Sequence, residues 1–309
     1  NKNNKIFVAR DRFGVRPLFE RNIFSKEINS YIYGFASELK VLNNINIDND
    51  MVPNNEIISF TPGTYSEFSK NNNNIFNKNK EKISYYQYPE INTLLTDIND
   101  INQIIVKNFN KAIYKRVVGT SERPIACLLS GGLDSSLVCA LVTKYYGNKI
   151  ETYSIGLEGS EDLKYATIVA NHLNTKHTNI ILTEDEFFSA IPAVIKTIES
   201  YDTTTIRASV GNYLIGKYIR ENSNAKVIFN GDGSDELMGG YLYFNAAPTS
   251  EEFDKECKRL LTDIHYFDVL RSDRCISTHG LEPRTPFLDF NWVSSYLSIP
   301  KNIRCHNNN

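Results

Sequence analysis

The sequence is poor in several residues that would reveal a protein's class on their own. It contains one Trp, two Met and five Cys among 309 residues, and no two cysteines have the C-x-x-C spacing of zinc and thiol redox sites. The cysteines therefore predict reduced, structural thiols in a cytosolic protein. No stretch reaches the roughly 18 apolar residues that a transmembrane helix needs.

Charge of either sign is also not in excess. The 34 Lys and Arg residues stand against 36 Asp and Glu, which gives a formal net charge of −2 and a pI near 6.3. A balanced chain has no broad electrostatic attraction for nucleic acid or for a membrane surface. Any phosphate-binding site must therefore be local.

Two regions with different patterns follow one another, and the length suits about two domains. Residues 1–95 show short β segments between turns, and an Asn- and Lys-rich stretch at 69–82 predicts a flexible surface insertion. In residues 96–309, apolar runs typical of buried strands alternate with apolar residues at helical spacing. This alternation predicts an α/β fold with a doubly wound parallel sheet. We expect strands at 125–129, 150–155, 177–182 and 226–229, helices at 98–118, 135–146, 162–173, 187–197 and 208–222, and a helical final third.

The first candidate site is the segment Ser130-Gly131-Gly132-Leu133-Asp134-Ser135-Ser136, between an expected strand and an expected helix. Backbone N–H groups at a helix start can bind phosphate, and the two glycines leave room for it. The serines add hydroxyl donors, and Asp134 can orient the loop or hold Mg²⁺. Neither the Walker motif nor the G-x-G-x-x-G dinucleotide motif is present. The alternative is an ordinary Gly-Gly turn with Asp134 or Ser135 capping the helix.

The second candidate site is Asn230-Gly231-Asp232-Gly233-Ser234-Asp235-Glu236, which follows another expected strand. Ligands of open α/β sheets collect at the carboxyl ends of the strands. Three carboxylates at such an end suit Mg²⁺ and the ammonium group of a substrate. The spacing is not that of an EF-hand, and the alternative is a solvated polar turn.

Further segments extend this pattern along the chain, at residues 10–18, 36–40, 153–157, 162–164, 199–209, 239–244 and 280–289. Together with both loops, they resemble asparagine synthetases of the glutamine-hydrolysing type. The Ser130–Ser136 motif alone is shared with several ligases that release pyrophosphate, whereas the later segments are more specific. A β-lactam synthetase-like enzyme is therefore the less favoured alternative.

The resemblance implies an ATP-pyrophosphatase (PP-loop) domain at 96–309, preceded at 1–95 by the second half of an N-terminal-nucleophile (Ntn) glutaminase domain. It implies that aspartate is activated by Mg·ATP as β-aspartyl-AMP and then amidated, with release of AMP and pyrophosphate. The implied substrates are aspartate, ATP and ammonia or glutamine. A homodimer is possible, and the expected location is the cytoplasm.

The resemblance also implies roles for single residues. Leu128 and Ile155 are expected to contact the adenosine, and Asn230 and Gly231 are expected to lie near the nucleotide. The pyrophosphate contacts fall to Ser130, Gly131, Gly132, Asp134, Ser135 and Ser136. The implied catalytic residues are Asp232, Asp235 and Glu236, and the magnesium ligands are Asp134 and Asp235. Arg207 and Arg284 are candidates for carboxylate or phosphate contacts, with a structural ion pair as the alternative.

The sequence departs from the family's pattern in ways that bear on activity. The first cysteine is Cys127, so we expect the glutaminase nucleophile and half-domain to be missing and glutamine not to be hydrolysed. We also expect the family's C-terminal catalytic lysine to lie beyond Asn309. The family usually carries Glu where Asp232 stands and Ser where Asn230 stands. These differences leave open a nucleotide-binding homologue with little or no turnover.

Overall fold

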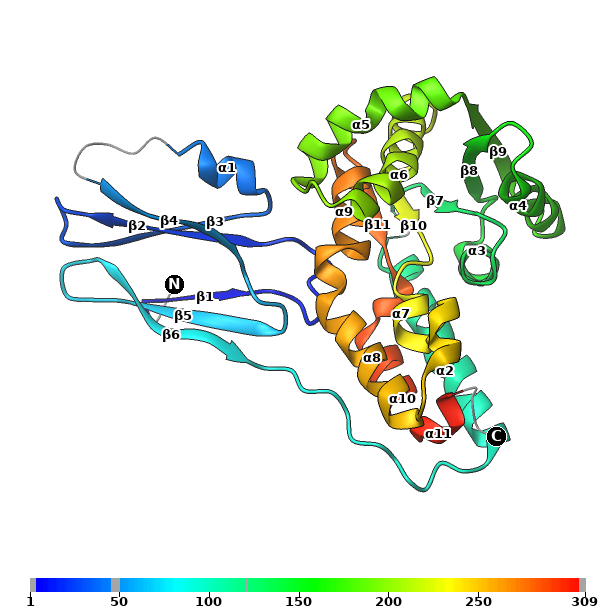
Figure 1. The fold of residues 1–309 in the computed structure, drawn as a ribbon, viewed down its shortest axis with the longest axis horizontal. Helices are drawn as coiled ribbons and strands as arrows, with labels where there is room; N and C mark the ends of the chain where they lie inside the picture. Colours follow the sequence, from blue (N-terminus) through cyan, green and yellow to red (C-terminus); the bar gives the residue numbers. More distant parts are fainter. Residues whose placement is uncertain (1–3, 46–50, 121, 306–309) are drawn as a thin grey trace. The chain divides into compact units, whose positions relative to one another are not determined.

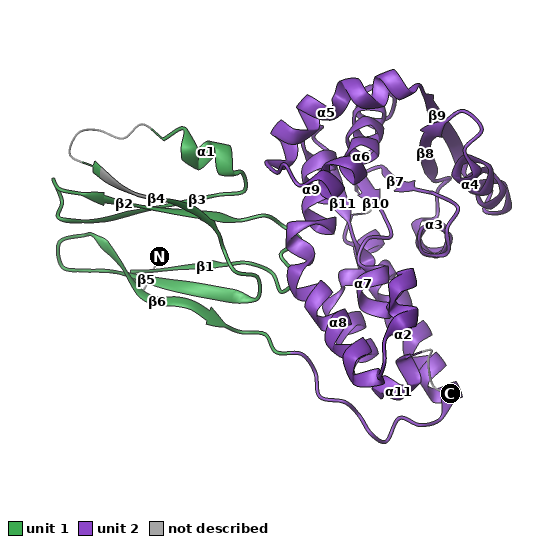
Figure 2. Cartoon of the chain, viewed as in Figure 1, with its two compact units in different colours: residues 1–87 green, residues 88–309 purple. Residues whose placement is uncertain are grey.

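The computed structural model describes residues 4–45, 51–120 and 122–305 (Figure 1). The chain divides into two compact units, Asn1–Gln87 and Tyr88–Asn309 (Figure 2). None of the helices in the described part of the chain is both long and apolar enough to cross a membrane. All five cysteines are buried and free of disulfides.

Unit 1 contains two antiparallel three-stranded sheets, with the strand orders β1-β5-β6 and β3-β2-β4. Its elements are β1 (Lys5–Ala9), β2 (Phe19–Ser25), β3 (Ser30–Ala36), α1 (Leu39–Asn43), β4 (Met51–Ser59), β5 (Thr64–Lys70) and β6 (Phe76–Ser84). The two sheets meet through aromatic side chains. The ring of Phe68 on β5 lies 4.8 Å from that of Tyr33 and 5.8 Å from that of Phe35, both on β3.

The flexible insertion predicted at residues 69–82 is wrong, because most of this stretch is the turn and the second strand of a β-hairpin. Strand β6 pairs antiparallel with β5. Lys78 on β6 reaches the fully buried Glu20 on β2 with an Nζ–Oε1 distance of 2.6 Å, and its ammonium lies over the rings of Tyr33 and Phe68. Long lysine side chains can cover an apolar surface in this way, so a strand rich in Asn and Lys can still be anchored.

Unit 2 is built on a five-stranded parallel sheet with the order β11-β10-β7-β8-β9. The strands are β7 (Ile125–Leu128), β8 (Glu151–Leu157), β9 (Lys176–Leu182), β10 (Val227–Phe229) and β11 (Glu282–Arg284). The α-helices are α2 (Ile98–Val118), α3 (Leu133–Tyr146), α4 (Glu161–His172), α5 (Glu184–Ile198), α6 (Thr203–Asn222), α7 (Ser234–Met238), α8 (Ser250–Asp263), α9 (Asp268–Ser277), α10 (Phe290–Leu297) and α11 (Lys301–Arg304). Short 3-10 helices are η1 (Leu242–Ala246), η2 (Ile264–Tyr266) and η3 (Pro286–Leu288).

The predicted α/β fold with a parallel sheet is confirmed. One face of the sheet packs against α6 and α9, where Ala126 and Ile228 join Ile215, Ile219 and Ile276 in a buried cluster. Helix α3 packs against β7. The strand that the sequence missed is β11, a three-residue edge strand with Pro283 in its middle. Proline argues against a strand, but the edge of a sheet tolerates it.

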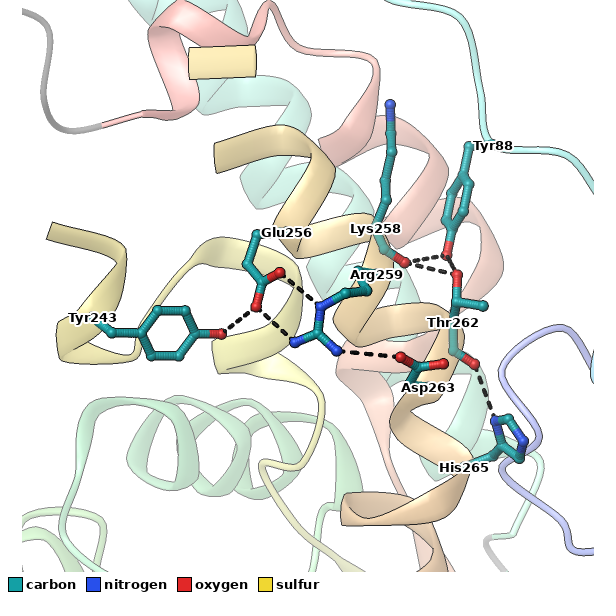
Figure 3. A network of polar contacts seen from close by, with 8 residues as sticks. All are labelled: Tyr88, Tyr243, Glu256, Lys258, Arg259, Thr262, Asp263 and His265. Atoms are coloured by element: carbon teal, nitrogen blue, oxygen red, sulfur yellow. Dashed lines mark hydrogen bonds and ion pairs between the residues drawn. The ribbon is translucent and has the colours of Figure 1, made fainter. Parts of the chain in front are cut away.

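The chain enters unit 2 as an extended segment that α8 holds. The hydroxyl of Tyr88 donates to the backbone oxygen of Lys258 at 3.0 Å and lies 2.9 Å from Oγ1 of Thr262 (Figure 3). Nδ1 of His265 lies 3.0 Å from the backbone oxygen of Thr262. Further along the segment, the backbone N–H of Asn92 donates to the backbone oxygen of Ser298 at 2.7 Å. The contacts of Tyr88 and Asn92 fix the segment before α2 begins.

Candidate active site

The order of the strands places both candidate loops at one point of the sheet. From β7 the chain continues to β8 and β9 on one side, and then to β10 on the other side of β7 (Figure 1). The strand order therefore reverses between β7 and β10. Crevices for ligands in open α/β sheets lie at such a reversal, outside the carboxyl ends of the strands. The loops 129–132 and 230–233 follow these two strands directly.

The loop after β7 is held by hydroxyl groups rather than by a helix cap. Oγ of Ser135 accepts from the backbone N–H of Ser130 at 3.2 Å, lies 3.0 Å from its Oγ, and donates to the backbone oxygen of Gly132 at 3.2 Å. Helix α3 begins at Leu133, two residues before the expected start, and its N-cap is Gly132, with no side-chain cap. The alternative in which Asp134 or Ser135 caps the helix is therefore wrong.

Both glycine-containing loops come close to a neighbouring backbone. Gly131 has φ +84°, and a Cβ there would lie 2.5 Å from the N atom of Ala166 on α4. A Cβ on Gly231 would lie 3.3 Å from the Cβ of Asp134 and 3.3 Å from the N atom of Ser135. The second loop thus lies against the first turn of α3, and the structure brings the two candidate loops together.

The loop after β10 is largely buried, so the solvated polar turn is wrong. Asn230 is 4% exposed, Ser234 3% and Glu236 1%, while Asp232 and Asp235 are partly buried. Buried carboxylates need partners or protons, because loss of water disfavours their charged form.

Asp232 lies between an amide and a guanidinium. Asn230 Nδ2 donates to its Oδ2 at 2.7 Å, and Nη2 of Arg271 lies 3.8 Å from its Oδ1. The same guanidinium group binds Oδ1 of Asp268 at 2.8 Å. Burial raises the pKa of Asp232 to about 6, with the positive charge of Arg271 acting in the opposite direction.

Glu236 shares this neighbourhood with a second acid. The hydroxyl of Tyr241 donates to Glu236 Oε1. Burial and the neighbouring Asp268 carboxylate raise the pKa of Glu236 to about 8. Glu236 therefore holds its proton to a higher pH than an exposed glutamate does. A neutral carboxyl group can donate a hydrogen bond, which a carboxylate cannot.

Asp134 and Asp235 come from different loops, and the charge of Asp134 acts on Asp235. Burial raises the pKa of Asp235, and the negative charges of Asp134 and Asp268 raise it further. A Cβ on Gly240 would lie 1.9 Å from Oδ1 of Asp235, so this glycine leaves the space that the carboxylate occupies.

Among the described residues, no three His, Cys, Asp or Glu side chains form a metal cage. Magnesium does not need one when carboxylates and phosphate oxygens share the coordination. The donor chemistry of Asp134 and Asp235 fits that arrangement.

The segment after α7 is anchored on α8. The hydroxyl of Tyr243 donates to Oε1 of Glu256 at 2.9 Å (Figure 3). Arg259 binds both oxygens of that carboxylate at 2.7 Å and reaches Oδ2 of Asp263 at 3.3 Å. These contacts along α8 fix the backbone around Tyr243, and so they also position Tyr241, whose hydroxyl binds Glu236.

The remaining predicted residues are two apolar side chains on strands of the sheet and two arginines. Leu128 ends β7 and Ile155 lies within the adjacent β8, each partly buried. Arg207 is exposed on α6. Arg284 ends β11 and forms an ion pair with Glu282 at 3.0 Å, which matches the structural alternative for this residue.

Comparison with known proteins identifies the family of the chain. The family model described as asparagine synthase matches residues 106–253 and 245–309, which is more than half of the chain. The chain belongs to the asparagine synthase family. The resemblance inferred from the sequence is thereby confirmed.

Relatives in the family match the chain almost from end to end. Asparagine synthetase [glutamine-hydrolyzing] from Bos taurus is 39% identical over 321 residues, which cover 99% of this chain and 56% of that protein. The proteins of the same name from Gallus gallus and Homo sapiens give the same identity and coverage. The chain thus spans about half the length of these relatives. Among solved structures, an NH3-dependent NAD synthetase from Campylobacter jejuni is 22% identical, covers 54% of this chain and 76% of that chain, and has a TM-score of 0.32.

Sequence reasoning missed four residues of this site: Tyr241, Asp268, Arg271 and Ser272. Asp268 and Arg271 stand three positions apart on α9, so both lie on one face of the helix. An Asp and an Arg at this spacing in a mostly buried helix are the pattern that could have identified them. Their distance along the chain from Asp232 concealed the contact.

Proposed function

We propose that the chain carries the synthetase site of an asparagine synthetase, which converts L-aspartate to L-asparagine at the expense of ATP. The β-carboxylate of aspartate attacks the α-phosphorus of ATP and forms β-aspartyl-AMP, with pyrophosphate leaving. Ammonia then attacks the activated carbonyl, and AMP leaves. The single observation that carries the proposal is the close approach of Gly231 to Asp134 and Ser135, where a Cβ would lie 3.3 Å from an atom of each. This approach joins a phosphate-type loop to an acidic loop in a chain of this family.

The loop after β7 is assigned to the phosphates. The backbone N–H groups before the first helical hydrogen bond, from Ser136 N to Gly132 O, are those that a helix leaves without an internal partner. They are suited to an anion. Ser130 and Ser136 add hydroxyl groups, while Leu128 and Ile155 are assigned to the adenosine.

The acidic loop is assigned to the metal, the amino acid and the chemistry. Asp134 and Asp235 would hold Mg²⁺, which supplies charge stabilisation for the phosphate groups when it is bound. Asp232, Asp235 and Glu236 are assigned to catalysis and substrate binding. Charge stabilisation and positioning are the main means by which such transfer reactions are accelerated.

The N-terminal part is assigned by the same family relation. We propose that residues 1–95 belong to an Ntn-type glutaminase domain and that residues 96–309 form the ATP-pyrophosphatase domain. The stacked antiparallel sheets of unit 1 support the first assignment. Glutamine would then be the natural source of ammonia, and the cytoplasm the place where the protein works.

The test is aspartate-dependent release of pyrophosphate from ATP, measured with the complete gene product. Ammonium and glutamine are supplied in separate reactions, and a reaction without aspartate is the control. Release with ammonium supports the synthetase assignment, and release with glutamine supports the glutaminase assignment as well. If neither nitrogen source gives pyrophosphate while ATP still binds, the chain is a nucleotide-binding homologue without turnover. Release in the absence of aspartate, with a different carboxylate, would indicate another amide ligase.

A further inference from the structure

Asn230 is the first residue after β10, and it is fixed at both its backbone and its side chain. Its N–H donates to the backbone oxygen of Arg284 at 3.1 Å. Its side-chain Nδ2 donates to Oδ2 of Asp232 at 2.7 Å and to Oγ of Ser272 at 2.5 Å. With 4% of its surface exposed, the amide has little freedom to choose other partners.

The other end of this amide argues against a purely structural role. Asn230 Oδ1 is buried and has no hydrogen-bond partner among the described residues. Burying an unpaired carbonyl oxygen disfavours folding, and native proteins rarely do so without a reason. The two bonds made by Nδ2 are therefore what the side chain contributes.

Asp232 is attracted by two partners, one at each oxygen of its carboxylate: Asn230 at Oδ2 and Arg271 at Oδ1. Arg271 lies 3.8 Å from one of its oxygens, beyond hydrogen-bond distance, and is already bound to Asp268 at 2.8 Å. Without the amide of Asn230, the guanidinium would be the strongest partner left for a buried carboxylate. The bond from Asn230 opposes that movement, and Ser272 holds the amide in place.

We propose that Asn230 is a positioning residue for the synthetase reaction: it keeps the carboxylate of Asp232 bound to its amide and beyond hydrogen-bond distance of Arg271. This inference rests on the proposed function and deepens it. It makes positions 230 and 232 a matched pair. A serine at 230 is too short to reach the Asp232 carboxylate, and a glutamate at 232 would push its carboxylate into the amide of Asn230.

The experiment compares Asn230→Ser, Asp232→Glu and the double variant in the complete gene product. Both single variants lower kcat for aspartate-dependent pyrophosphate release about 10- to 100-fold, because the carboxylate is misplaced by roughly one methylene. Their KM for ATP stays within about threefold, as expected when only the chemical step is affected. The double variant recovers to within about threefold of the parent, since the longer acid no longer meets the amide.

Two further variants separate positioning from general damage. Ser272→Ala loosens the amide of Asn230 and lowers kcat in the same sense but less. Asn222→Ser is the matched control, because Asn222 Nδ2 also donates a hydrogen bond, to the backbone oxygen of Tyr218 at 2.9 Å, on an exposed helix end away from both loops. It leaves kcat unchanged.

The outcomes distinguish this inference from the proposed function. A parent protein that releases no pyrophosphate overturns both. An active parent whose Asn230→Ser variant keeps full activity overturns the positioning role alone. The same holds if Asp232→Glu by itself raises the rate, or if the losses of the two single variants simply multiply in the double variant.

Discussion

The two loops of the candidate site lie at the ends of neighbouring strands, yet they are built in opposite ways. The loop after β7 leaves Ser130 and Gly132 exposed and is tied together by hydroxyl and backbone groups. The loop after β10 buries Asn230 and Glu236 and depends on side chains from a distant helix.

The difference follows from the charge that each loop would handle. A loop for phosphate must present N–H and hydroxyl donors to the ligand, so it can stay open and needs no charged neighbour. Buried carboxylates repel one another, so the acidic loop requires Arg271 and protons to be stable. Changes in the first loop should therefore act through backbone shape, and changes in the second through charge.

The largest effect is expected at Gly131. An alanine there must adopt φ +84° and place its Cβ 2.5 Å from the N atom of Ala166. Backbone strain and overpacking together should lower the free energy of unfolding by about 2–4 kcal/mol and reduce pyrophosphate release by about 100-fold or more. Urea unfolding and the pyrophosphate assay measure the two effects.

Gly147 is the matched control for this variant. It has φ +74°, but a Cβ there has no atom within 4 Å, so Gly147→Ala carries the strain without the collision. We expect a loss of about 1 kcal/mol and normal activity. Equal losses for Gly131→Ala and Gly147→Ala would mean that contact with α4 does not shape the phosphate loop.

A change of charge without a change of shape tests the second loop. Asp235→Asn keeps the size of the side chain beside Gly240 but removes a proposed magnesium ligand. We expect kcat/KM to fall on the order of 100-fold and the Mg²⁺ concentration for half-maximal rate to rise. Asp100→Asn removes an exposed acid from the first turn of α2, outside the site, and should leave kcat/KM and the magnesium dependence unchanged. An unaltered magnesium dependence of Asp235→Asn would exclude it as a ligand.

The two loops also differ in how far the sequence could predict them. The loop after β7 is local: a strand, two glycines and a helix follow within a few residues, so its place could be derived from pattern alone. The partners of the acidic loop could not, because Asp268, Arg271 and Ser272 are separated from Asp232 by more than thirty positions. Only the packing of α9 against β11 and α6 brings them together.

Errors in the fold have the same origin. Strand β11 contains Pro283 and becomes a strand only by pairing with β10. Strand β6 has an Asn- and Lys-rich sequence and is held by β5 and by the ion pair of Lys78 with Glu20. In both segments long-range pairing outweighs local propensity. Helix α2 depends on its own apolar period and on its N-cap Asp97, so its bounds agree with those expected.

The pH dependence of stability tests the burial of Glu236. Its pKa is raised to about 8 in the folded protein, from an ordinary value of 4.5. The stabilisation is therefore complete below about pH 4.5 and is lost as pH rises through 8. Glu236→Gln mimics the protonated form, so its gain in unfolding free energy over the parent should grow with pH to about 1–3 kcal/mol at pH 8. Urea unfolding at pH 5, 6.5 and 8 measures it.

Glu256 should show the opposite dependence of stability on pH. The hydrogen bonds from Arg259 lower its pKa, so the stability that it contributes is present above its ordinary pKa and is lost as pH falls. Glu256→Gln should therefore give no gain at pH 8. A gain that is equal in both variants, or independent of pH, would contradict a protonated Glu236.

The smallest effect separates two adjacent serines of the phosphate loop. Ser135 ties the loop together, whereas Oγ of Ser136 is buried and has no hydrogen-bond partner among the described residues. Removing an unpaired hydroxyl should leave the melting temperature of Ser136→Ala unchanged or slightly higher, while ATP binds about 3- to 10-fold more weakly if this hydroxyl receives a phosphate oxygen. Ser135→Ala should lose stability and affinity together. Thermal unfolding and calorimetric titration with Mg·ATP measure both quantities. Affinity that is unchanged in Ser136→Ala would remove this residue from the phosphate site and leave the binding to the backbone of α3.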